Sequence, residues 1–207
     1  MAFLLTRLLK IKRLKKLNYN YMKDLKKDNL YKKNFPVNHK FIFDNNVTDV
    51  FEDMVSRSVP GYEFLIKNIG VISKKFYQQN TAIYDLGSSL CACSLSILEK
   101  LENAEVQIYA VDSSKAMIDT CKQNINKKEI KFIKSDILDI NIKNASIVIL
   151  NLTLQFISVD KRTYLLKKIF SKLNKNGVII ITEKIILDKT SDDIFFKNFH
   201  DFFKENN

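Results

Sequence analysis

The sequence predicts an α/β protein built on a doubly wound, mostly parallel β-sheet. From residue 82 onward, short apolar runs alternate with segments whose apolar residues recur at helical spacing, which is the pattern of strand–helix–strand units. Each of the first four runs also ends at or near a polar residue, in turn Asp85, Asp112, Asp136 and Asn151. Right-handed crossovers bring the carboxyl ends of such strands to one edge of the sheet, so we expect a ligand site there.

Two helices are predicted ahead of the sheet. The first starts near Val47 and ends before Pro60-Gly61, and the second extends from Tyr62 to Phe76. The later pattern predicts strands at 82–86, 106–111, 130–133, 146–152 and 178–182, with helices at 89–101, 114–126, 160–173 and 191–204. We expect Asn176-Gly177 to end the helix at 160–173 and strand 178–182 to be buried on both faces.

The charge is concentrated near the amino terminus. The chain has 207 residues and a net charge of +11, but residues 1–33 hold eleven Lys or Arg against two Asp, so the body is nearly neutral. We divide the chain into a basic N-terminal extension (1–21), a helical segment (22–80) and a Rossmann-like cofactor-binding domain (81–207). The extension could be a basic amphipathic helix on a membrane or RNA, or could precede a true start at Met22.

Several classes of protein are excluded by composition. No apolar run approaches the roughly 18 residues that cross a bilayer, so we expect no stable membrane association. The cysteines Cys91, Cys93 and Cys121 suit a reducing cytoplasm better than a disulfide framework. Cys91 and Cys93 lack the partners that would complete a metal site, so no metal is expected. We assign no role to His39 or His200.

The stretch from Asp85 to Cys91 is predicted to form the lip of the ligand site. An acid, a glycine and small residues follow a strand and precede a helix, where backbone N–H groups point outward. We expect Asp85 to accept hydrogen bonds from a cationic or hydroxyl-bearing ligand, and Gly87 to allow that ligand close to the backbone.

The spacing of the motif favours a cationic nucleoside. Asp112 follows Gly87 by 25 residues, and an acid at the end of the second strand commonly accepts hydrogen bonds from ribose hydroxyls. The glycines of a pyrophosphate-binding loop are missing, and Asp85 would repel a pyrophosphate, which argues against NAD. S-adenosylmethionine fits better, with Asp112 on the ribose and Asp136 accepting from the adenine amino group.

Longer motifs resemble carboxy-S-adenosyl-L-methionine synthase, a family of tRNA wobble-uridine modification. The matching motifs are Arg57-Ser58-Val59-Pro60-Gly61-Tyr62, Tyr84-Asp85-Leu86-Gly87-x-Ser89-Leu90, Asp112-x-Ser114-x-Ala116-Met117-Ile118, and the run from Asn144 to Phe156. The resemblance begins near Met22. It implies a Rossmann-like class I S-adenosylmethionine-dependent methyltransferase fold, a homodimer, and conversion of S-adenosylmethionine and prephenate to carboxy-S-adenosylmethionine and phenylpyruvate.

The resemblance also implies which residues bind the cofactor, which is consumed as a substrate. These are Tyr62, Gly87, Ser88, Ser89, Asp112, Ser113, Asp136, Ile137 and Asn151. No side chain is assigned as catalytic, because the family's proposed mechanism takes its base from the substrate. We do not expect the chain to bind tRNA directly, and the role of the basic extension stays open.

Two departures from the family pattern bear on activity. Cys91 stands where the family has glycine, and we expect its side chain to crowd the cofactor. The family also continues past the segment matching His200-Asp201-Phe202, with two more strands and an arginine that grips the new carboxylate, so we interpret this chain as C-terminally truncated. An ordinary S-adenosylmethionine-dependent methyltransferase and an inactive cofactor-binding remnant are the alternatives.

Overall fold

The computed structural model describes residues 45–102, 105–185, 187 and 190–206. Its centre is a five-stranded parallel sheet in the order β3-β2-β1-β4-β5. The strands are β1 (Ala82–Leu86), β2 (Gln107–Asp112), β3 (Ile130–Lys134), β4 (Ala145–Asn151) and β5 (Leu173–Thr182). The prediction of a doubly wound parallel sheet is therefore confirmed. Met22, His39 and the basic extension 1–21 lie outside the described residues.

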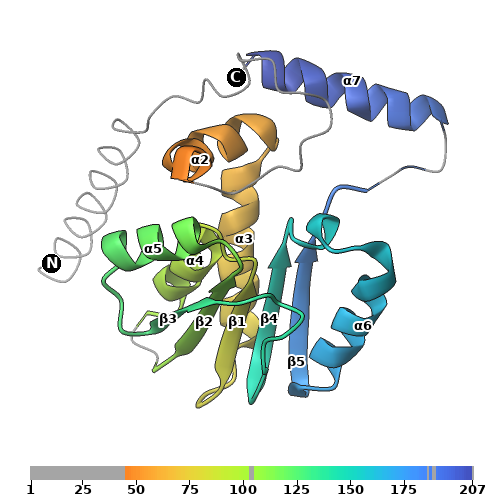
Figure 1. Cartoon of the computed structure of the whole chain (residues 1–207). Coiled ribbons are helices and arrows are strands. Elements are labelled where there is room, and N and C mark those ends of the chain that lie inside the picture. Colours follow the sequence, from red (N-terminus) through yellow and green to blue (C-terminus); the bar gives the residue numbers. More distant parts are fainter. Residues whose placement is uncertain (1–44, 103–104, 186, 188–189, 207) are drawn as a thin grey trace, which may run out of the picture.

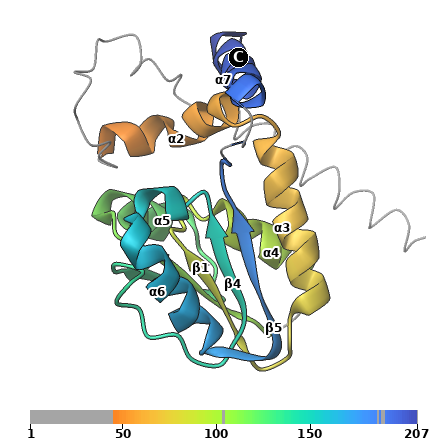
Figure 2. The same cartoon turned by 90° about the vertical axis from the view of Figure 1, so that its right-hand side faces the viewer.

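Helices cover both faces of the sheet, which gives three layers (Figures 1 and 2). The helices α3 (Tyr62–Phe76), α4 (Ala92–Lys100) and α5 (Lys115–Asn124) pack on one face. The other face is covered by α6 (Val159–Phe170) and by the segment 135–144. Alternate strand residues point to opposite faces, so Ile83 joins the first core while Tyr84 and Leu86 join the second.

Two further helices lie beyond the carboxyl ends of the strands. In Figure 1 the arrowheads of the strands point toward α2 (Asn45–Ser58) and α7 (Thr190–Asn206), which lie next to each other above the sheet. The short 3-10 helix η2 (Leu154–Phe156) follows β4 on the same side. These elements enclose the edge at which the sequence predicts a ligand site.

The region around Asn176-Gly177 was predicted wrongly. The helix ends at Phe170, and Asn176-Gly177 lies inside β5, which begins at Leu173. Asn176 has a φ of 64°, and the β4–β5 register shifts between Ala145 and Ile147. A side chain at Gly177 would meet two backbone oxygens at 3.0 Å. The pair therefore forms an irregularity within a strand instead of a helix stop.

The last strand is also less buried than its composition suggests. β5 lies at the edge of the sheet in the described structure. Ile180 is buried, but Ile181 exposes 43% of its surface. The prediction of burial on both faces is wrong because a strand with one neighbour and partial helix cover keeps one side accessible.

None of the helices in the described ranges is both long and apolar enough to span a bilayer. Other predicted bounds agree with the structure to within a few residues. The main exception besides α6 is the helix expected at 89–101, which begins only at Ala92. The residues before it, Ser88 to Cys91, form a turn that lines or supports the site.

Candidate active site

A cavity of about 640 Å³ opens at the carboxyl ends of β1 to β4, beneath α2 and η2. It meets the topological switch point, where the chain reverses direction across the sheet between β1 and β4. All nine residues predicted to contact the cofactor line this one cavity: Tyr62, Gly87, Ser88, Ser89, Asp112, Ser113, Asp136, Ile137 and Asn151. The structure thus brings together residues that span ninety positions of sequence.

The turn after β1 holds three residues with positive φ. These are Gly87 (79°), Ser89 (47°) and Cys91 (66°). The N–H groups of Gly87 and Ser88 donate to the carbonyl of Val111, at 2.8 and 3.0 Å, which ties the turn to β2. The close neighbour of Gly87 is Thr153, whose side chain lies 2.6 Å from where a Cβ would be. Glycine is therefore required here by packing between two loops as well as by its backbone conformation.

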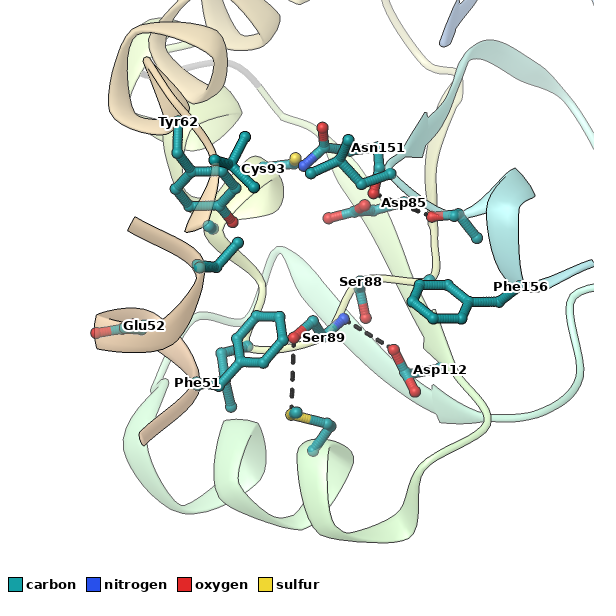
Figure 3. A pocket seen from close by; sticks show the side chains of 18 of the residues that line it. Phe51, Glu52, Tyr62, Asp85, Ser88, Ser89, Cys93, Asp112, Asn151 and Phe156 are labelled. Carbon is teal, nitrogen blue, oxygen red and sulfur yellow. Dashed lines mark hydrogen bonds between the residues drawn. The ribbon is translucent and has the colours of Figure 1, made fainter. Parts of the chain in front are cut away.

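Asp112 links this turn to the start of α5. One carboxylate oxygen accepts from the backbone N–H of Ser89 at 2.9 Å (Figure 3). The other accepts from the backbone N–H of Ser114 at 2.8 Å. A carboxylate can accept about four hydrogen bonds, and the backbone of Ser113 also contributes one, so capacity for about one more is left. Burial raises the pKa of Asp112, while the hydrogen bonds from Ser114, Ser89 and Ser113 lower it.

Ser88 has a hydroxyl that a ligand could satisfy. The side chain is buried and lines the cavity, yet its oxygen has no hydrogen-bond partner among the described residues. An unsatisfied buried hydroxyl costs about 1–3 kcal/mol. Its position at the cavity wall is therefore consistent with a polar ligand atom at this point.

Asp136 and Ile137 follow the carboxyl end of β3 and form that end of the cavity. Asp136 is exposed, and one of its oxygens accepts from the N–H of Leu138 at 2.9 Å. Ile137 is buried beside it. An acceptor next to an apolar side chain suits a heterocycle with an amino group, which agrees with the adenine position that the sequence suggests.

Asp85 lines the cavity and also has a structural role that the sequence does not suggest. It is only 1% exposed, and its Oδ2 accepts from the N–H of Ser94 at 3.2 Å and from the Ser94 hydroxyl at 2.7 Å. Burial raises its pKa to about 6, against the effect of these hydrogen bonds. Through Oδ2, Asp85 therefore fastens α4 to the end of β1, in addition to its place in the cavity lining.

The effect expected of Cys91 is also different in the structure. Cys91 is fully buried, and its Sγ lies 3.2 Å from the Sγ of Cys121 on α5. It does not line the cavity, whereas its neighbours Leu90 and Ala92 do. The expectation that Cys91 crowds the cofactor is therefore not supported. Cys91 instead affects the backbone, because a non-glycine residue is held in the left-handed region at a φ of 66°. This conformation costs roughly 1–2 kcal/mol.

The end of the cavity at β4 is formed by Asn151, Cys93 and Tyr62, which lie close together in Figure 3. Burial raises the pKa of the Cys93 thiol well above its usual range, and the nearby charge of Asp85 adds to this. The pKa of Tyr62 is also raised, mainly by burial. The nearby groups Cys93, Asp85 and Glu52 raise this pKa further through their charge. The Cys93 thiol and the Tyr62 hydroxyl are therefore uncharged at neutral pH.

The wall opposite the sheet was not recognised from the sequence. It is formed by α2 and η2, with Phe51 and Phe156 facing the turn residues (Figure 3), and Lys204 of α7 reaches the same cavity. Phe156 is 60% exposed. Phe51 belongs to the apolar face of its helix and Lys204 is exposed, so periodicity does not distinguish either of them from an ordinary core or surface residue.

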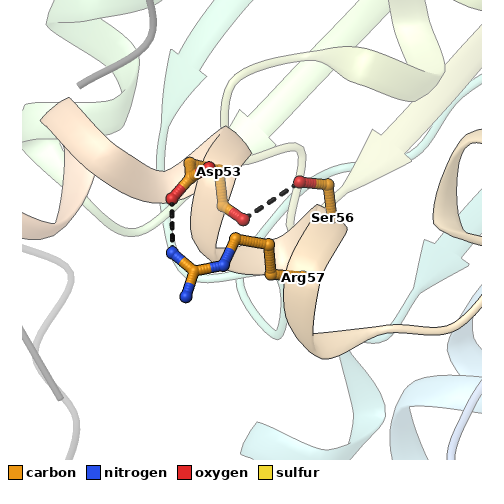
Figure 4. A network of polar contacts seen from close by, with 3 residues as sticks. All are labelled: Asp53, Ser56 and Arg57. Atoms are coloured by element: carbon orange, nitrogen blue, oxygen red, sulfur yellow. Dashed lines mark hydrogen bonds and ion pairs between the residues drawn. The ribbon is translucent and has the colours of Figure 1, made fainter. Parts of the chain in front are cut away.

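Arg57, which is part of the sequence motif before Tyr62, does not line the cavity. Its Nη1 forms an ion pair with Asp53 at 3.0 Å, and Ser56 donates to the Asp53 carbonyl at 3.0 Å (Figure 4). These contacts close the last turns of α2 just before Pro60-Gly61. The motif therefore supports the helix that carries the cavity wall.

The charge of the cavity is predominantly negative. Its described lining contains a single lysine, Lys204, and five acidic side chains: Glu52, Glu63, Asp85, Asp112 and Asp136. Burial raises the pKa of Glu52, Asp85 and Asp112. A bound cation would relieve this penalty, because an opposite charge favours the ionised form of a carboxylate. No cluster of three metal-ligating side chains is present in the described part of the chain.

Comparison with known proteins first defines the class. Residues 83–177 match the protein-family model that describes a methyltransferase domain. A Leishmania major S-adenosylmethionine-dependent methyltransferase has a TM-score of 0.54 at 15% identity, covering 77% of this chain and 68% of its own. The plantazolicin methyltransferase BpumL, in complex with S-adenosylhomocysteine, has a TM-score of 0.54 at 17% identity, covering 76% and 64%. The chain therefore has the Rossmann-like class I methyltransferase fold.

Sequence identity then defines the family. Three proteins named carboxy-S-adenosyl-L-methionine synthase align over most of the chain. That of Shewanella piezotolerans is 43% identical over 166 residues, covering 78% of this chain and 68% of its own. Those of Vibrio vulnificus, at 42%, and Citrobacter koseri, at 43%, cover 80% and 79% of this chain and 70% and 68% of theirs. The chain belongs to the carboxy-S-adenosyl-L-methionine synthase family and is an enzyme of the transferase class.

Proposed function

We propose that this protein converts S-adenosylmethionine and prephenate to carboxy-S-adenosylmethionine, phenylpyruvate and water. The observation that carries the proposal is the identity of 42–43% to relatives with this name over about four-fifths of the chain. The cavity supports it, because its nine predicted contacts and its excess of acids suit a cationic nucleoside.

The strand order suggests how S-adenosylmethionine would lie. Along the edge the strands follow β3, β2, β1 and β4, so the polar groups follow as Asp136, Asp112, the Gly87 turn and Asn151. Adenine at Asp136 and ribose at Asp112 would place the sulfonium and the amino-acid portion between the Gly87 turn and Asn151. The reacting methyl group would then face the wall formed by α2, η2 and α7.

The wall formed by α2, η2 and α7 has both apolar surface and a positive charge, which suit a cyclic acid. Phe51, Val59, Phe156 and Ile157 offer apolar surface, and Lys204 offers a cation beside them. A dianionic ring compound placed among five acids requires at least one positive group, because unpaired anions in such a site repel. We assign Lys204 to a carboxylate of prephenate.

The chemistry requires no general base from the protein. Prephenate loses its ring carboxylate as CO₂ and its ring hydroxyl as hydroxide, and the ring becomes aromatic as phenylpyruvate. The hydroxide removes a proton from the sulfonium methyl group to give water and an ylide. The ylide carbon then bonds to CO₂. The chain would hold both substrates together and exclude bulk water from the ylide.

The family also suggests a setting for this reaction. The product would supply the carboxymethyl group for uridine-5-oxyacetic acid at the tRNA wobble position. We further propose that the enzyme acts in the cytoplasm and as a homodimer. Light scattering of the purified protein tests the dimer.

The proposal is tested by incubating the purified protein with S-adenosylmethionine and prephenate. Mass spectrometry should detect a carboxylated sulfonium, and its formation should require both compounds. Formation of S-adenosylhomocysteine with a methyl acceptor, independent of prephenate, would instead identify an ordinary methyltransferase. Binding of S-adenosylmethionine without any turnover would identify a cofactor-binding remnant. Either result would overturn the proposal.

A further inference from the structure

Asn151 is held by a partner that lies outside the cavity. Asn151 and Thr182 end the neighbouring strands β4 and β5 and face each other in the register. The hydroxyl of Thr182 donates to Oδ1 of Asn151 in a short hydrogen bond. Thr182 does not line the cavity, whereas Asn151 does. Any effect of Thr182 on a ligand must therefore pass through the Asn151 amide.

The backbone around this pair is fixed as well. The carbonyl of Thr182 accepts from the N–H of Leu152 at 2.8 Å. The hydroxyl of Thr153 donates to the carbonyls of Asn151 at 3.1 Å and of Leu86 at 3.0 Å. These bonds fix the backbone at Asn151, so only its side-chain torsions are left to be set. The hydrogen bond from Thr182 selects the orientation of the side-chain amide.

The chosen orientation determines what the cavity offers. A primary amide has one acceptor oxygen and one NH₂ donor group. Because Thr182 occupies the oxygen, the nitrogen must point the other way, and Figure 3 shows it beside the sulfur of Cys93, which lines the cavity. Burial raises the pKa of Cys93, so this neighbour is a neutral thiol and a weak acceptor. The NH₂ group therefore keeps donor capacity for a ligand.

Side chains that could donate a hydrogen bond to an anion are few at the β4 end of the cavity lining. Five carboxylates line the cavity in the described structure, and these groups accept hydrogen bonds but repel an anion. With Lys204 assigned to prephenate, a second ligand carboxylate at the β4 end depends on neutral donors there, such as the Asn151 amide and the Tyr62 hydroxyl. If the ribose lies at Asp112, this is also the end at which the amino-acid carboxylate of S-adenosylmethionine would lie.

We propose that Thr182 is a positioning residue which orients the Asn151 amide so that its NH₂ group binds the amino-acid carboxylate of S-adenosylmethionine. The inference rests on the proposed function only for the identity of the cofactor. It needs neither prephenate nor carboxyl transfer, and it concerns a residue one strand away from the ligand.

The test compares two ligands that differ only in this carboxylate, S-adenosylmethionine and its decarboxylated form. Isothermal titration calorimetry on the wild-type chain should show a preference for S-adenosylmethionine. In Thr182→Val, which keeps the shape of the side chain but loses the hydroxyl, the dissociation constant for S-adenosylmethionine should rise about tenfold, as expected for one charged hydrogen bond. Binding of the decarboxylated ligand should change less than twofold.

Three further variants make the result decisive. Thr182→Ser restores the hydroxyl and should restore the preference. Asn151→Asp can still accept from Thr182 but loses the NH₂ group, so it should also lose the preference. Thr163→Val makes the same chemical change at an exposed position on α6 and should have no effect.

An equal loss of affinity for both ligands in Thr182→Val would mean that Thr182 serves only the fold, and would overturn the inference. An unchanged preference would overturn it as well. A failed carboxylation assay with an intact ligand preference would reject the proposed function and leave this inference standing.

Discussion

The two walls of the cavity are built in different ways. The sheet-edge wall is formed by the strand ends and the turn after β1. Hydrogen bonds from Ser89 to Asp112, and from Gly87 and Ser88 to Val111, tie it together, and three residues from Gly87 to Cys91 have positive φ. The helical wall, formed by α2, η2 and α7, presents mainly apolar side chains such as Phe51 and Phe156. No residue of α7 is fully buried.

This difference separates two tasks. The sheet-edge wall fits a fixed nucleoside, because hydrogen-bonded and strained backbone holds its groups in one arrangement. The helical wall fits a substrate that must enter and leave, because helices with few buried side chains open at low cost. Substitutions in the sheet-edge wall should therefore affect folding and cofactor binding, and those in the helical wall the second substrate.

The largest effect is expected from Gly87→Ala in the sheet-edge wall. The new Cβ would lie 2.6 Å from the Thr153 side chain at a φ of 79°. Left-handed strain and overpacking together should lower the free energy of unfolding by about 2–5 kcal/mol. Gly61→Ala is the matched control, since Gly61 has a φ of 74° but nothing within 4 Å of its Cβ position. Urea unfolding should show a loss of only about 1–2 kcal/mol there, and equal losses would contradict the packing argument.

Asp85 should make stability depend on pH. Burial raises its pKa to about 6 from 3.8, so between these values the folded chain binds the proton more tightly than the unfolded chain does. The contribution of Asp85 to the free energy of unfolding therefore falls as pH rises through this window, by about 3 kcal/mol at most, and is constant above it.

The measurement is urea unfolding of the ligand-free wild type and Asp85→Asn at pH 4.5 and pH 7. The stability of the wild type relative to the variant should decrease between the two values, because asparagine does not titrate. Asp139→Asn, at an exposed position, serves as the control and should run parallel to the wild type. If the stability of Asp85→Asn changes with pH in the same way as that of the wild type, the Asp85 carboxylate does not have the raised pKa described.

A change in the helical wall should affect the second substrate alone. In Lys204→Ala the KM for prephenate should rise about tenfold, as one charged contact is lost, while the dissociation constant for S-adenosylmethionine stays within twofold. Lys204→Arg should keep most of the affinity. Lys197→Ala changes a lysine on the same helix that does not line the cavity, and should leave both constants unchanged. A loss of cofactor affinity in Lys204→Ala would remove the distinction between the walls.

The smallest effect is expected from Cys91→Gly. The Cys91 side chain faces Cys121 and not the cavity, so the dissociation constant for S-adenosylhomocysteine should change less than twofold. The relief of left-handed strain and the loss of a buried thiol oppose each other in stability. Calorimetry with this ligand checks the prediction, and a gain of tenfold or more would mean that Cys91 does crowd the cofactor.

The sheet-edge wall was largely predictable from sequence, for physical reasons. Asp112, Asp136 and Asn151 follow apolar runs, and parallel topology alone requires that they meet at one edge. The fold followed from the same alternation. The hydrogen bonds from Ser94 to Asp85 were not predicted, because a sequence does not show whether an acid at a strand end also contacts the next helix.

The helical wall was hidden because its residues obey ordinary rules. Phe51 fits the apolar face of an amphipathic helix, and Lys204 fits a solvated one, so neither differs from a residue without function. Thr182 ends a strand like many other threonines, and only the register with Asn151 reveals its role. Asn176-Gly177 has the composition of a helix stop, yet pairing of β5 with β4 outweighs that local preference.

The most direct test of the whole account follows one carbon atom. Prephenate labelled at its ring carboxylate is incubated with the protein and unlabelled S-adenosylmethionine, and the sulfonium product is analysed by mass spectrometry. We expect the label to move into the new carboxyl group on the sulfonium methyl carbon, with phenylpyruvate formed in equal amount. Label found only in free CO₂, with S-adenosylmethionine unchanged or converted to S-adenosylhomocysteine, would contradict it.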